Sequence, residues 1–379
     1  MKRVLYLYSF VSETNELYFL NDEEEVVKCD KNQLLIVLSS LKNKQISINL
    51  NTIFEPKNIL VSPLNSPIEF LKGNYILTDL QENIKERIMN NLAIKQDVLF
   101  FGLTGGPGTG KTLLLYDIAK ELSKTYKILI FHCGYLCKGH ETLNCEMENV
   151  RIAEARALRY KEIRNADIVF VDESHRIYPT QLDKIERWAI RSKTACLFSF
   201  DESQRLSHFE YRSNSYESIV KICGDNIEKL TNKIRTNQEI STFISKLRNQ
   251  NKHKEEKTFP NVKIIYEPNK EKGVILAKEM EKCGYTYISF TNSSYNARLD
   301  YQKSNRDTHD VIGQEFDKVV MTFPNDFYFH NGMLNAKTHP NPNYMLDQLL
   351  YQGLTRARTG IALIVEGEDN LSIILSMFA

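Results

Sequence analysis

The sequence has little cysteine, no long apolar run and almost no net charge. Its 379 residues include seven cysteines, a sparse and odd set that excludes a fully paired disulfide framework and indicates a reducing cytoplasm. No segment approaches the ~20 apolar residues that a membrane-spanning helix needs. Lys and Arg total 49 against 48 Asp and Glu, a net charge of +1. A nucleic acid would therefore be bound by a local patch or cleft rather than by a global basic field.

The rest of the composition is that of an ordinary globular chain. Hydrophobic residues make up 42% and charged residues 26%, which allows a sizeable core and argues against wholesale disorder. The length suggests two or three domains. Met1-Lys2-Arg3 and the short run Val4–Tyr8 mimic a signal peptide, but polar residues follow without a small-residue cleavage site, so a first β-strand is the better interpretation.

Two alternations of strands and helices follow a different N-terminal segment. Residues 1–68 carry short apolar-aromatic runs between polar clusters, which predicts a small α/β or mostly β domain. Pro63, Asn65 and Pro67 mark its boundary. Apolar strands then alternate with helices over residues 69–232 and again over 233–379; they include a strand predicted at Ala195–Phe200 and a helix predicted at Gln238–Arg248. This pattern predicts an α/β fold with parallel sheets covered on both faces.

A phosphate-binding loop is the strongest motif. Residues 105–112 match G-x-x-x-x-G-K-[ST] in full, after a predicted strand and before a predicted helix. Lys111 would reach the β- and γ-phosphates of ATP, and Thr112 would hold Mg²⁺. The glycines expected to let backbone N–H groups point at the phosphates are Gly105, Gly108 and Gly110. The alternative is a glycine-rich turn that merely links strand to helix.

Two acids follow the apolar strand Ile168–Val171. Asp172 is placed at the carboxyl end of that strand to hold Mg²⁺ through water, and Glu173 to polarise the attacking water as a general base. Paired acids after an apolar run also occur as plain surface turns. Their distance along the chain from Thr112 favours the catalytic interpretation.

Six segments resemble, in chain order, the motifs of superfamily 1 helicases. Asp172-Glu173-Ser174-His175-Arg176 resembles the D-E-x-H box. The others resemble the Q-motif, motif III, motif IV, motif V and motif VI, and are residues 77–81, 200–204, 230–235, 308–316 and 353–358 respectively. The D-E-x-H-R spelling and the compact size resemble most closely the schlafen-like DNA/RNA helicase domain within the UvrD-like superfamily.

The resemblance implies a P-loop NTPase of two tandem RecA-like lobes that clamp one ATP between them. Gln81 would read the adenine edge, and Gln204 would sense the γ-phosphate. Arg235 and Arg356 would act as arginine fingers from the second lobe, a contribution of ~10³ to 10⁵ in rate. Glu315 of motif V is a further expected nucleotide contact. Closing and opening of the lobes would move the chain along single-stranded DNA or RNA.

The sequence departs from these motifs at three positions. Ile234 replaces the aromatic residue that usually stacks on the base, Ile312 replaces the usual Lys of motif V, and Phe200 replaces the leading Gly of motif III. The spacing between motifs is also short, which implies that the large inserted domains of bigger members are absent. The sequence therefore supports processive unwinding less than ATP hydrolysis.

Candidate nucleic-acid contacts come from the ends of predicted strands. Phe209 and Tyr211 follow motif III, where relatives carry a base-stacking aromatic worth ~1–3 kcal/mol per base; core packing is the alternative. The segment 291–293 and His309 occupy expected strand-end positions. A separate group invites a zinc interpretation, although its spacing matches no established pattern; its members are His132, Cys133, Cys137, His140 and Cys145.

Two other functions remain open. The protein could be an ATP-dependent switch that regulates a protein partner through residues 1–68, for which the resemblance implies a bacterial defence setting. Motifs V and VI favour the motor, because a switch does not need two fingers in one chain, and the short spacing favours the switch. A GTPase is poorly supported, since residues 232–235 lack the Asp that would read guanine.

Overall fold

The computed structural model describes residues 8–11, 16–20, 26–30, 32, 61–93, 100–158, 163–231, 238–252, 258–291, 304–337 and 343–378. The chain divides into two compact units, Met1–Asn58 and Ile59–Ala379. Val61 and Leu64, which the sequence-based division assigned to the N-terminal domain, pack in a core with residues of the P-loop lobe. The expected boundary between the lobes, at residues 232 and 233, lies outside the described residues.

The first unit contains a small antiparallel sheet in the order β1-β2-β3. Its strands are β1 (Tyr8–Val11), β2 (Glu16–Leu20) and β3 (Val26–Cys29). Val26 at the start of β3 is 71% exposed. The expected small N-terminal domain is therefore present as a separate unit of β structure.

The first lobe of the second unit is a six-stranded sheet in the order β6-β5-β7-β8-β4-β9, with every pairing parallel. Its strands are β4 (Phe100–Gly105), β5 (Ile128–His132), β6 (Val150–Glu154), β7 (Ile168–Asp172), β8 (Ala195–Phe200) and β9 (Ile227–Leu230). Because β8 lies between β7 and β4, the carboxyl ends of these strands bring the P-loop, Asp172 and motif III to one edge. Ligands of open parallel sheets bind at such an edge.

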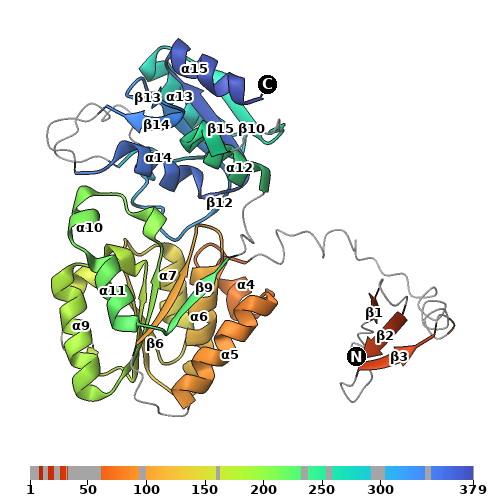
Figure 1. Ribbon diagram of the computed structural model, residues 1–379, viewed down its shortest axis with the longest axis vertical. Helices are drawn as coiled ribbons and strands as arrows, with labels where there is room; N and C mark the ends of the chain where they lie inside the picture. Colours follow the sequence, from red (N-terminus) through yellow and green to blue (C-terminus); the bar gives the residue numbers. More distant parts are fainter. Residues whose placement is uncertain are drawn as a thin grey trace. The chain divides into compact units, whose positions relative to one another are not determined.

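Helices cover both faces of this sheet (Figure 1). One face packs on α4 (Pro67–Leu71), α5 (Asp79–Ala93), α6 (Lys111–Leu122) and α7 (Lys138–Glu146), and the other on α9 (Pro179–Ser192) and α11 (Ser215–Cys223). Successive strand residues point to opposite faces: Ile130 joins the core with α6, and Phe131 joins the core with α9. Both faces are therefore apolar, as expected of a parallel sheet.

Short elements at the carboxyl edge carry several site residues. They are η1 (Ala155–Ala157), η2 (Ser174–Arg176), η3 (Glu202–Gln204) and α10 (His208–Arg212). Ser207 caps α10 by accepting a hydrogen bond from the Glu210 N–H at 3.2 Å, and the Glu210 carboxylate accepts from the Ser207 N–H in return. This reciprocal pair satisfies two backbone donors and defines the start of the helix.

The second lobe has a four-stranded parallel sheet in the order β10-β15-β12-β11. Its strands are β10 (Val262–Tyr266), β11 (Thr286–Tyr287), β12 (Phe316–Phe323) and β15 (Ala357–Val365), and a separate hairpin joins β13 (Phe327–His330) to β14 (Met333–Ala336). Its helices are α12 (Gln238–Arg248), α13 (Lys270–Glu281), α14 (Leu346–Leu354) and α15 (Glu368–Leu375), with η4 (Gln250–Lys252) and η6 (Ser376–Phe378).

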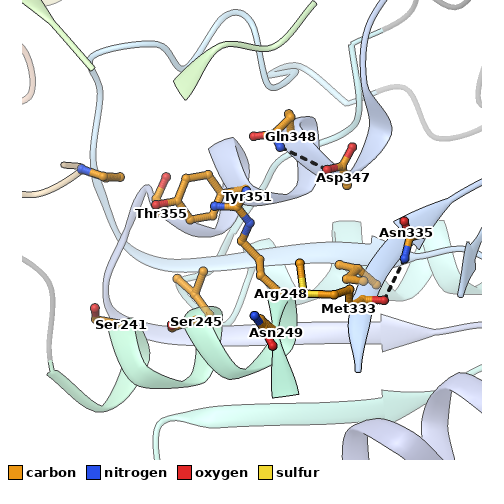
Figure 2. A pocket seen from close by; sticks show the side chains of 13 residues that line it. Ser241, Ser245, Arg248, Asn249, Met333, Asn335, Asp347, Gln348, Tyr351 and Thr355 are labelled. Atoms are coloured by element: carbon orange, nitrogen blue, oxygen red, sulfur yellow. Dashed lines mark hydrogen bonds between the residues drawn. The ribbon is translucent and has the colours of Figure 1, made fainter. Parts of the chain in front are cut away.

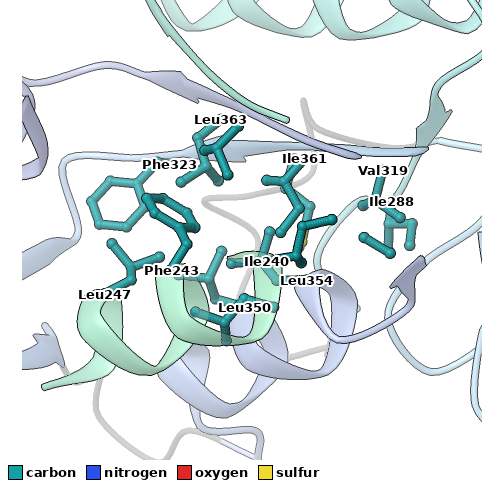
Figure 3. Close-up of a cluster of buried hydrophobic side chains, with 14 of the residues drawn as sticks. Ile240, Phe243, Leu247, Ile288, Val319, Phe323, Leu350, Leu354, Ile361 and Leu363 are labelled. Carbon is teal, nitrogen blue, oxygen red and sulfur yellow. The ribbon is translucent and has the colours of Figure 1, made fainter. Parts of the chain in front are cut away.

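The larger core of the second lobe lies between the sheet and helices α12 and α14. Figure 3 shows Phe323 and Leu363 facing Phe243 of α12 and Leu350 of α14. Phe243 is fully buried, and its ring lies 5.5 Å from that of Phe259. Burial of these apolar side chains holds α12 and α14 against the sheet.

The expected α/β fold with parallel sheets is confirmed. In the part of the chain that the structure describes, no helix combines the length and apolarity needed to cross a membrane.

Candidate functional site

The P-loop connects the end of β4 to the start of α6. Gly108 has a φ of 73° and Gly110 a φ of 85°, in the left-handed region that glycine adopts without penalty. Gly110 directly precedes α6. The first N–H groups of a helix lack partners inside it, and together with the helix dipole they form an anion site. The local backbone is therefore shaped to receive phosphate.

Lys111 is buried and folded onto its own loop. Its Nζ donates to the carbonyl oxygens of Gly105 at 2.7 Å and Gly106 at 3.0 Å, and lies 3.4 Å from Oδ2 of Asp201. Asp201 Oδ2 also accepts a hydrogen bond from Nε2 of Gln204 at 2.8 Å. One carboxylate thus holds both the P-loop lysine and the motif III glutamine. Asp201 lies within motif III, but the sequence alone did not predict a role for it.

Asp172 ends β7 and is almost fully buried. Neither of its carboxylate oxygens has a hydrogen-bond partner within the described residues, although Oδ2 lies 3.4 Å from Nδ1 of His132. Buried polar atoms are normally satisfied, so an unsatisfied carboxylate needs an explanation. Carboxylate and hydroxyl oxygens suit Mg²⁺, and Thr112 lies at the phosphate cavity described below. Asp172 and Thr112 therefore fit the metal that the P-loop implies.

Glu173 adopts a backbone conformation that is uncommon for any residue but glycine, with a φ of 55°. Such strain tends to be retained where function requires it. Its Oε2 lies 3.4 Å from Nε2 of His175 and 3.8 Å from Nε of Arg176. His175 accepts the Asp201 N–H at Nδ1, and burial, together with the charges of Arg176 and Lys111, holds the pKa of His175 well below its usual range. The neutral ring therefore carries its proton on Nε2, beside Glu173.

Arg356 provides the contact from the second lobe. Its Nη2 donates to Oε1 of Gln204 at 3.1 Å, Nε to the carbonyl of Gln352 at 3.2 Å and Nη1 to the carbonyl of Gln314 at 3.3 Å. Burial lowers the pKa of Arg356, and the charge of Glu173 opposes this. In the described part of the chain no carboxylate lies within ion-pair distance of this guanidinium. A buried, preoriented guanidinium suits a phosphate oxygen.

These side chains surround a cavity of about 30 Å³, which we call the phosphate cavity. Its lining residues come from both lobes and are Pro107, Gly108, Gly110, Lys111, Thr112, Glu173, Gln204, Gly313, Glu315 and Arg356. Most of the residues expected at the nucleotide are thus brought together. Asn65, which is not on this wall, exchanges two hydrogen bonds with the backbone of Glu315, at 2.6 and 2.9 Å.

Three expected site residues lie next to this cavity rather than on its wall. The carbonyl oxygen of Gly105 accepts a hydrogen bond from Lys111 Nζ. Asp172 is the last residue of β7 and directly precedes Glu173. Gln81 is 1% exposed; its Nε2 donates to the Thr109 carbonyl at 3.4 Å, and its Oε1 accepts from the Thr78 N–H at 2.9 Å. Gln81 therefore supports the P-loop. Arg235 lies outside the described residues.

A second cavity of about 430 Å³, which we call the aromatic cavity, lies at the carboxyl edge between the lobes. Its walls include His132, Tyr135, Arg156, Arg176, Tyr178 and Phe209 from the first lobe and His309 and Tyr344 from the second. Tyr178 is 50% and Phe209 44% exposed, and their rings lie 5.0 Å apart. Such exposed aromatic surface, with arginines beside it, is suited to stacking with bases.

The other candidate nucleic-acid residues have mixed positions. His309 lines the aromatic cavity, and burial lowers its pKa to about 4. Tyr211 is not among the lining residues and instead packs against the guanidinium of Arg205 at 4.3 Å. Thr291 accepts the His309 N–H at 2.9 Å and so positions motif V. Residues 292 and 293 lie outside the described part of the chain.

The third cavity, of about 490 Å³, was not foreseen from the sequence (Figure 2). It is lined by α12, α14 and β14 and shares Pro107 with the phosphate cavity. Figure 2 shows Arg248 lying across Tyr351, with the guanidinium 4.1 Å from the ring centre. The cavity therefore borders the P-loop on the side of the second lobe.

Of the five His and Cys residues considered for zinc, Cys137 and His140 are used at the start of a helix. The Cys137 N–H donates to Nδ1 of His140 at 3.0 Å and starts α7, and the rings of His132 and His140 lie 4.5 Å apart. Across the described residues, no group of three or more His, Cys, Asp or Glu side chains is arranged to hold a metal ion. His140 therefore serves as a helix cap and a ring that packs on His132.

The central part of the chain matches a known protein family. Residues 99–322, more than half of the chain, match the family described as Schlafen group 3, DNA/RNA helicase domain. The chain belongs to this family. Comparison with curated proteins finds no match. The resemblance expected from the motifs is confirmed.

Solved structures of other helicases are similar to this chain at low sequence identity. Pif1 helicase from Candida albicans is 13% identical over 80% of this chain and 99% of that chain, with a TM-score of 0.44. Pif1 from Bacteroides sp. in complex with ADP-AlF4 is 14% identical over 79% of this chain and 96% of that chain, with a TM-score of 0.41.

Proposed function

We propose that this schlafen-family helicase domain hydrolyses ATP with Mg²⁺ and couples hydrolysis to binding or movement along single-stranded nucleic acid. The observation that carries the proposal is the phosphate cavity, whose wall is built from the P-loop, Glu173 and Gln204 of one lobe and Glu315 and Arg356 of the other. A ligand at this position would hold the lobes together, and its cleavage would release them.

The chain's own residues have distinct roles in this reaction. Lys111 leaves the Gly105 and Gly106 carbonyls to bind the β- and γ-phosphates. Thr112 and Asp172 would hold Mg²⁺, which when bound would supply positive charge beside the phosphate oxygens. Glu173 accepts a proton from the attacking water, and the neutral His175 keeps its Nε2–H beside that carboxylate. The strained backbone of Glu173 fixes its direction.

Gln204 and Arg356 connect cleavage to the position of the lobes. They hydrogen-bond to each other across the lobes and line the phosphate cavity. A γ-phosphate at this place would give Arg356 a charged acceptor in place of an amide oxygen, which is a stronger hydrogen bond. Hydrolysis removes that acceptor and weakens the closed arrangement. Arg235 is proposed as the second finger, and Gln81 and Glu315 as contacts to the nucleoside side.

The aromatic cavity is the proposed binding site for the strand. It lies at the same edge of the sheet, and the guanidinium groups of Arg156 and Arg176 lie in its wall, where they pair with Glu154 and Glu210. Stacking on Tyr178 and Phe209 suits bases of any sequence. The family's description as a DNA/RNA helicase domain supports this assignment.

Steady-state ATP hydrolysis with and without single-stranded DNA and RNA oligonucleotides tests the proposal, with Glu173→Gln as the blank. Stimulation of at least about tenfold by one polymer, absent in the blank, is the expected result and identifies the substrate. Hydrolysis indifferent to both polymers would contradict the motor. It would favour the alternative of a switch that acts on a protein partner through residues 1–68.

A further inference from the structure

His132 is a buried histidine between the two proposed sites. It ends β5 and is paired in register with Asp172 at the end of β7. Its side chain is 0% exposed, and Nδ1 lies 3.4 Å from Oδ2 of Asp172. The same side chain contributes to the wall of the aromatic cavity. His132 is thus a residue of that wall whose side chain also approaches the carboxylate of the proposed Mg²⁺ ligand.

Backbone from both lobes packs on the other edge of the imidazole. A Cβ added to Gly134 would meet Nε2 of His132 at 2.8 Å, and one added to Gly313 would meet its Cε1 at 3.4 Å. Gly134 precedes Tyr135, whose ring lies 4.9 Å from that of His309. Movement of Tyr135 or of motif V would therefore press on the ring. The ring of His140 lies 4.5 Å from that of His132 on another side.

Neither ring nitrogen of His132 has a hydrogen-bond partner within the described residues, and the same is true of both oxygens of Asp172. Leaving such groups buried and unpaired is unfavourable. A small rotation of the Asp172 carboxylate would let Oδ2 accept from Nδ1–H and leave Oδ1 for Mg²⁺. Side chains that orient a metal-binding carboxylate in this way commonly set its affinity for the metal.

We propose that His132 is a positioning residue that orients Asp172 for Mg²⁺ and transmits occupancy of the aromatic cavity by nucleic acid to that carboxylate. The inference rests on the proposed function. A strand that displaces Tyr135 or His309 moves Gly134 and motif V against the ring, which brings Nδ1 to Asp172. Strand binding then favours the metal-bound arrangement and so stimulates hydrolysis.

Two substitutions separate the two parts of this role. His132→Leu removes both nitrogens, whereas His132→Asn retains an N–H near the position of Nδ1 but lacks the far edge of the ring. The first readout is the Mg²⁺ concentration that half-saturates binding of a fluorescent ATP analogue. The second is the ratio of ATP hydrolysis with and without single-stranded oligonucleotide. His140→Asn is the control, because it removes a ring that packs on His132 and leaves the nitrogens of His132 in place.

For His132→Leu we expect the Mg²⁺ midpoint to rise by about tenfold to 100-fold and the stimulation ratio to fall towards one. His132→Asn should restore the midpoint to within about threefold of wild type but not the ratio. His140→Asn should keep the wild-type midpoint. A wild-type midpoint and ratio in His132→Leu would overturn the proposal and make His132 a packing residue.

Circular dichroism and thermal melting establish that each variant is folded. If His132→Leu does not fold, His132→Asn still decides the matter: a lost ratio supports the proposal, and a wild-type ratio overturns it. Failure of the proposed function is recognised separately, because the wild-type protein itself would then show no stimulation by either polymer.

Discussion

Arg356 donates a hydrogen bond from Nη2 to Oε1 of Gln204 over 3.1 Å and thereby joins the second lobe to the first. Both side chains are buried and both line the phosphate cavity. Gln204 is held in turn by Asp201, which also lies beside Lys111. A continuous polar chain therefore runs from the P-loop lysine to the arginine of motif VI.

Arg356→Ala should lower kcat for ATP hydrolysis by about 10³-fold or more, because the guanidinium is proposed to neutralise charge on the transferring phosphoryl group. Arg356→Lys should restore little, since a single ammonium cannot reproduce the contacts to Gln204, Gln314 and Gln352. Steady-state kinetics provide the measurement, and Arg358→Ala is the matched control, with kcat expected within about twofold of wild type. Retention of wild-type kcat in Arg356→Ala would exclude a role as a finger.

Asp201→Ala should reduce kcat by about 30-fold, because hydrogen bonds to charged groups are worth ~2 kcal/mol and this carboxylate positions both Lys111 and Gln204. The neighbouring Glu202 points to solvent and pairs with Arg205 at 2.9 Å. Glu202→Ala is therefore the control and should change kcat little. Equal kinetics for the two variants would show that Asp201 does not position the catalytic groups.

Phe209→Ala should weaken binding of a single-stranded oligonucleotide by roughly 5-fold to 150-fold, the equivalent of ~1–3 kcal/mol for one stacked base. Tyr211→Ala changes an exposed aromatic on the same short helix, but Tyr211 packs on Arg205 outside the aromatic cavity. Fluorescence anisotropy with labelled oligonucleotides measures both. If the two variants bind equally well, the strand does not use this cavity.

The stability of the folded chain should fall as the pH is lowered from about 6.5 towards 4. Burial lowers the pKa of His309 from 6.5 to about 4, so in this interval the unfolded chain binds a proton that the folded chain does not. The contribution of His309 to the free energy of unfolding is therefore fully present above pH 6.5 and is lost as the pH falls from 6.5 to about 4. Urea denaturation at pH 7.5 and 5.5 measures the change.

Two variants test whether His309 contributes to that pH dependence. His309→Gln should lose less stability between pH 7.5 and 5.5 than wild type, because it removes one group that must be protonated on unfolding. His330→Gln changes an exposed histidine at the end of β13 and should behave as wild type. An identical loss in all three proteins would rule out His309 as a source.

The sequence predicts most strands and helices in segments where the apolar residues form a continuous run or recur at the helical period. The buried strand Ala195–Phe200 and the amphipathic helix Gln238–Arg248 have the expected bounds. Strand β6 was not predicted, although Val150, Arg151 and Ile152 alternate between buried and exposed, which is the period-2 pattern of a half-buried strand. The β13–β14 hairpin was also missed, although Asn331-Gly332, both with positive φ, carries the turn signal that such hairpins need.

The motifs predicted most of the residues that line the phosphate cavity but not their mutual contacts. The spacing of Gln204 and Arg356 along the chain contains no information on their distance, because that depends on how the lobes pack. His132 was considered only as a zinc ligand, since its pairing with Asp172 arises from the strand order rather than from proximity in sequence. Asn65 was noted only as part of a boundary, and its bonds to Glu315 span 250 positions.

The central claim is that the nucleotide and the strand are bound by coupled sites on one chain. The most direct test is the affinity of Glu173→Gln for single-stranded oligonucleotide without nucleotide, with Mg²⁺-ATP and with Mg²⁺-ADP. The account predicts that the affinities in ATP and ADP differ by about tenfold or more, with a reciprocal effect of the strand on nucleotide affinity. Equal affinities in all three states would contradict it, because ATP would then bind without changing the site for the strand.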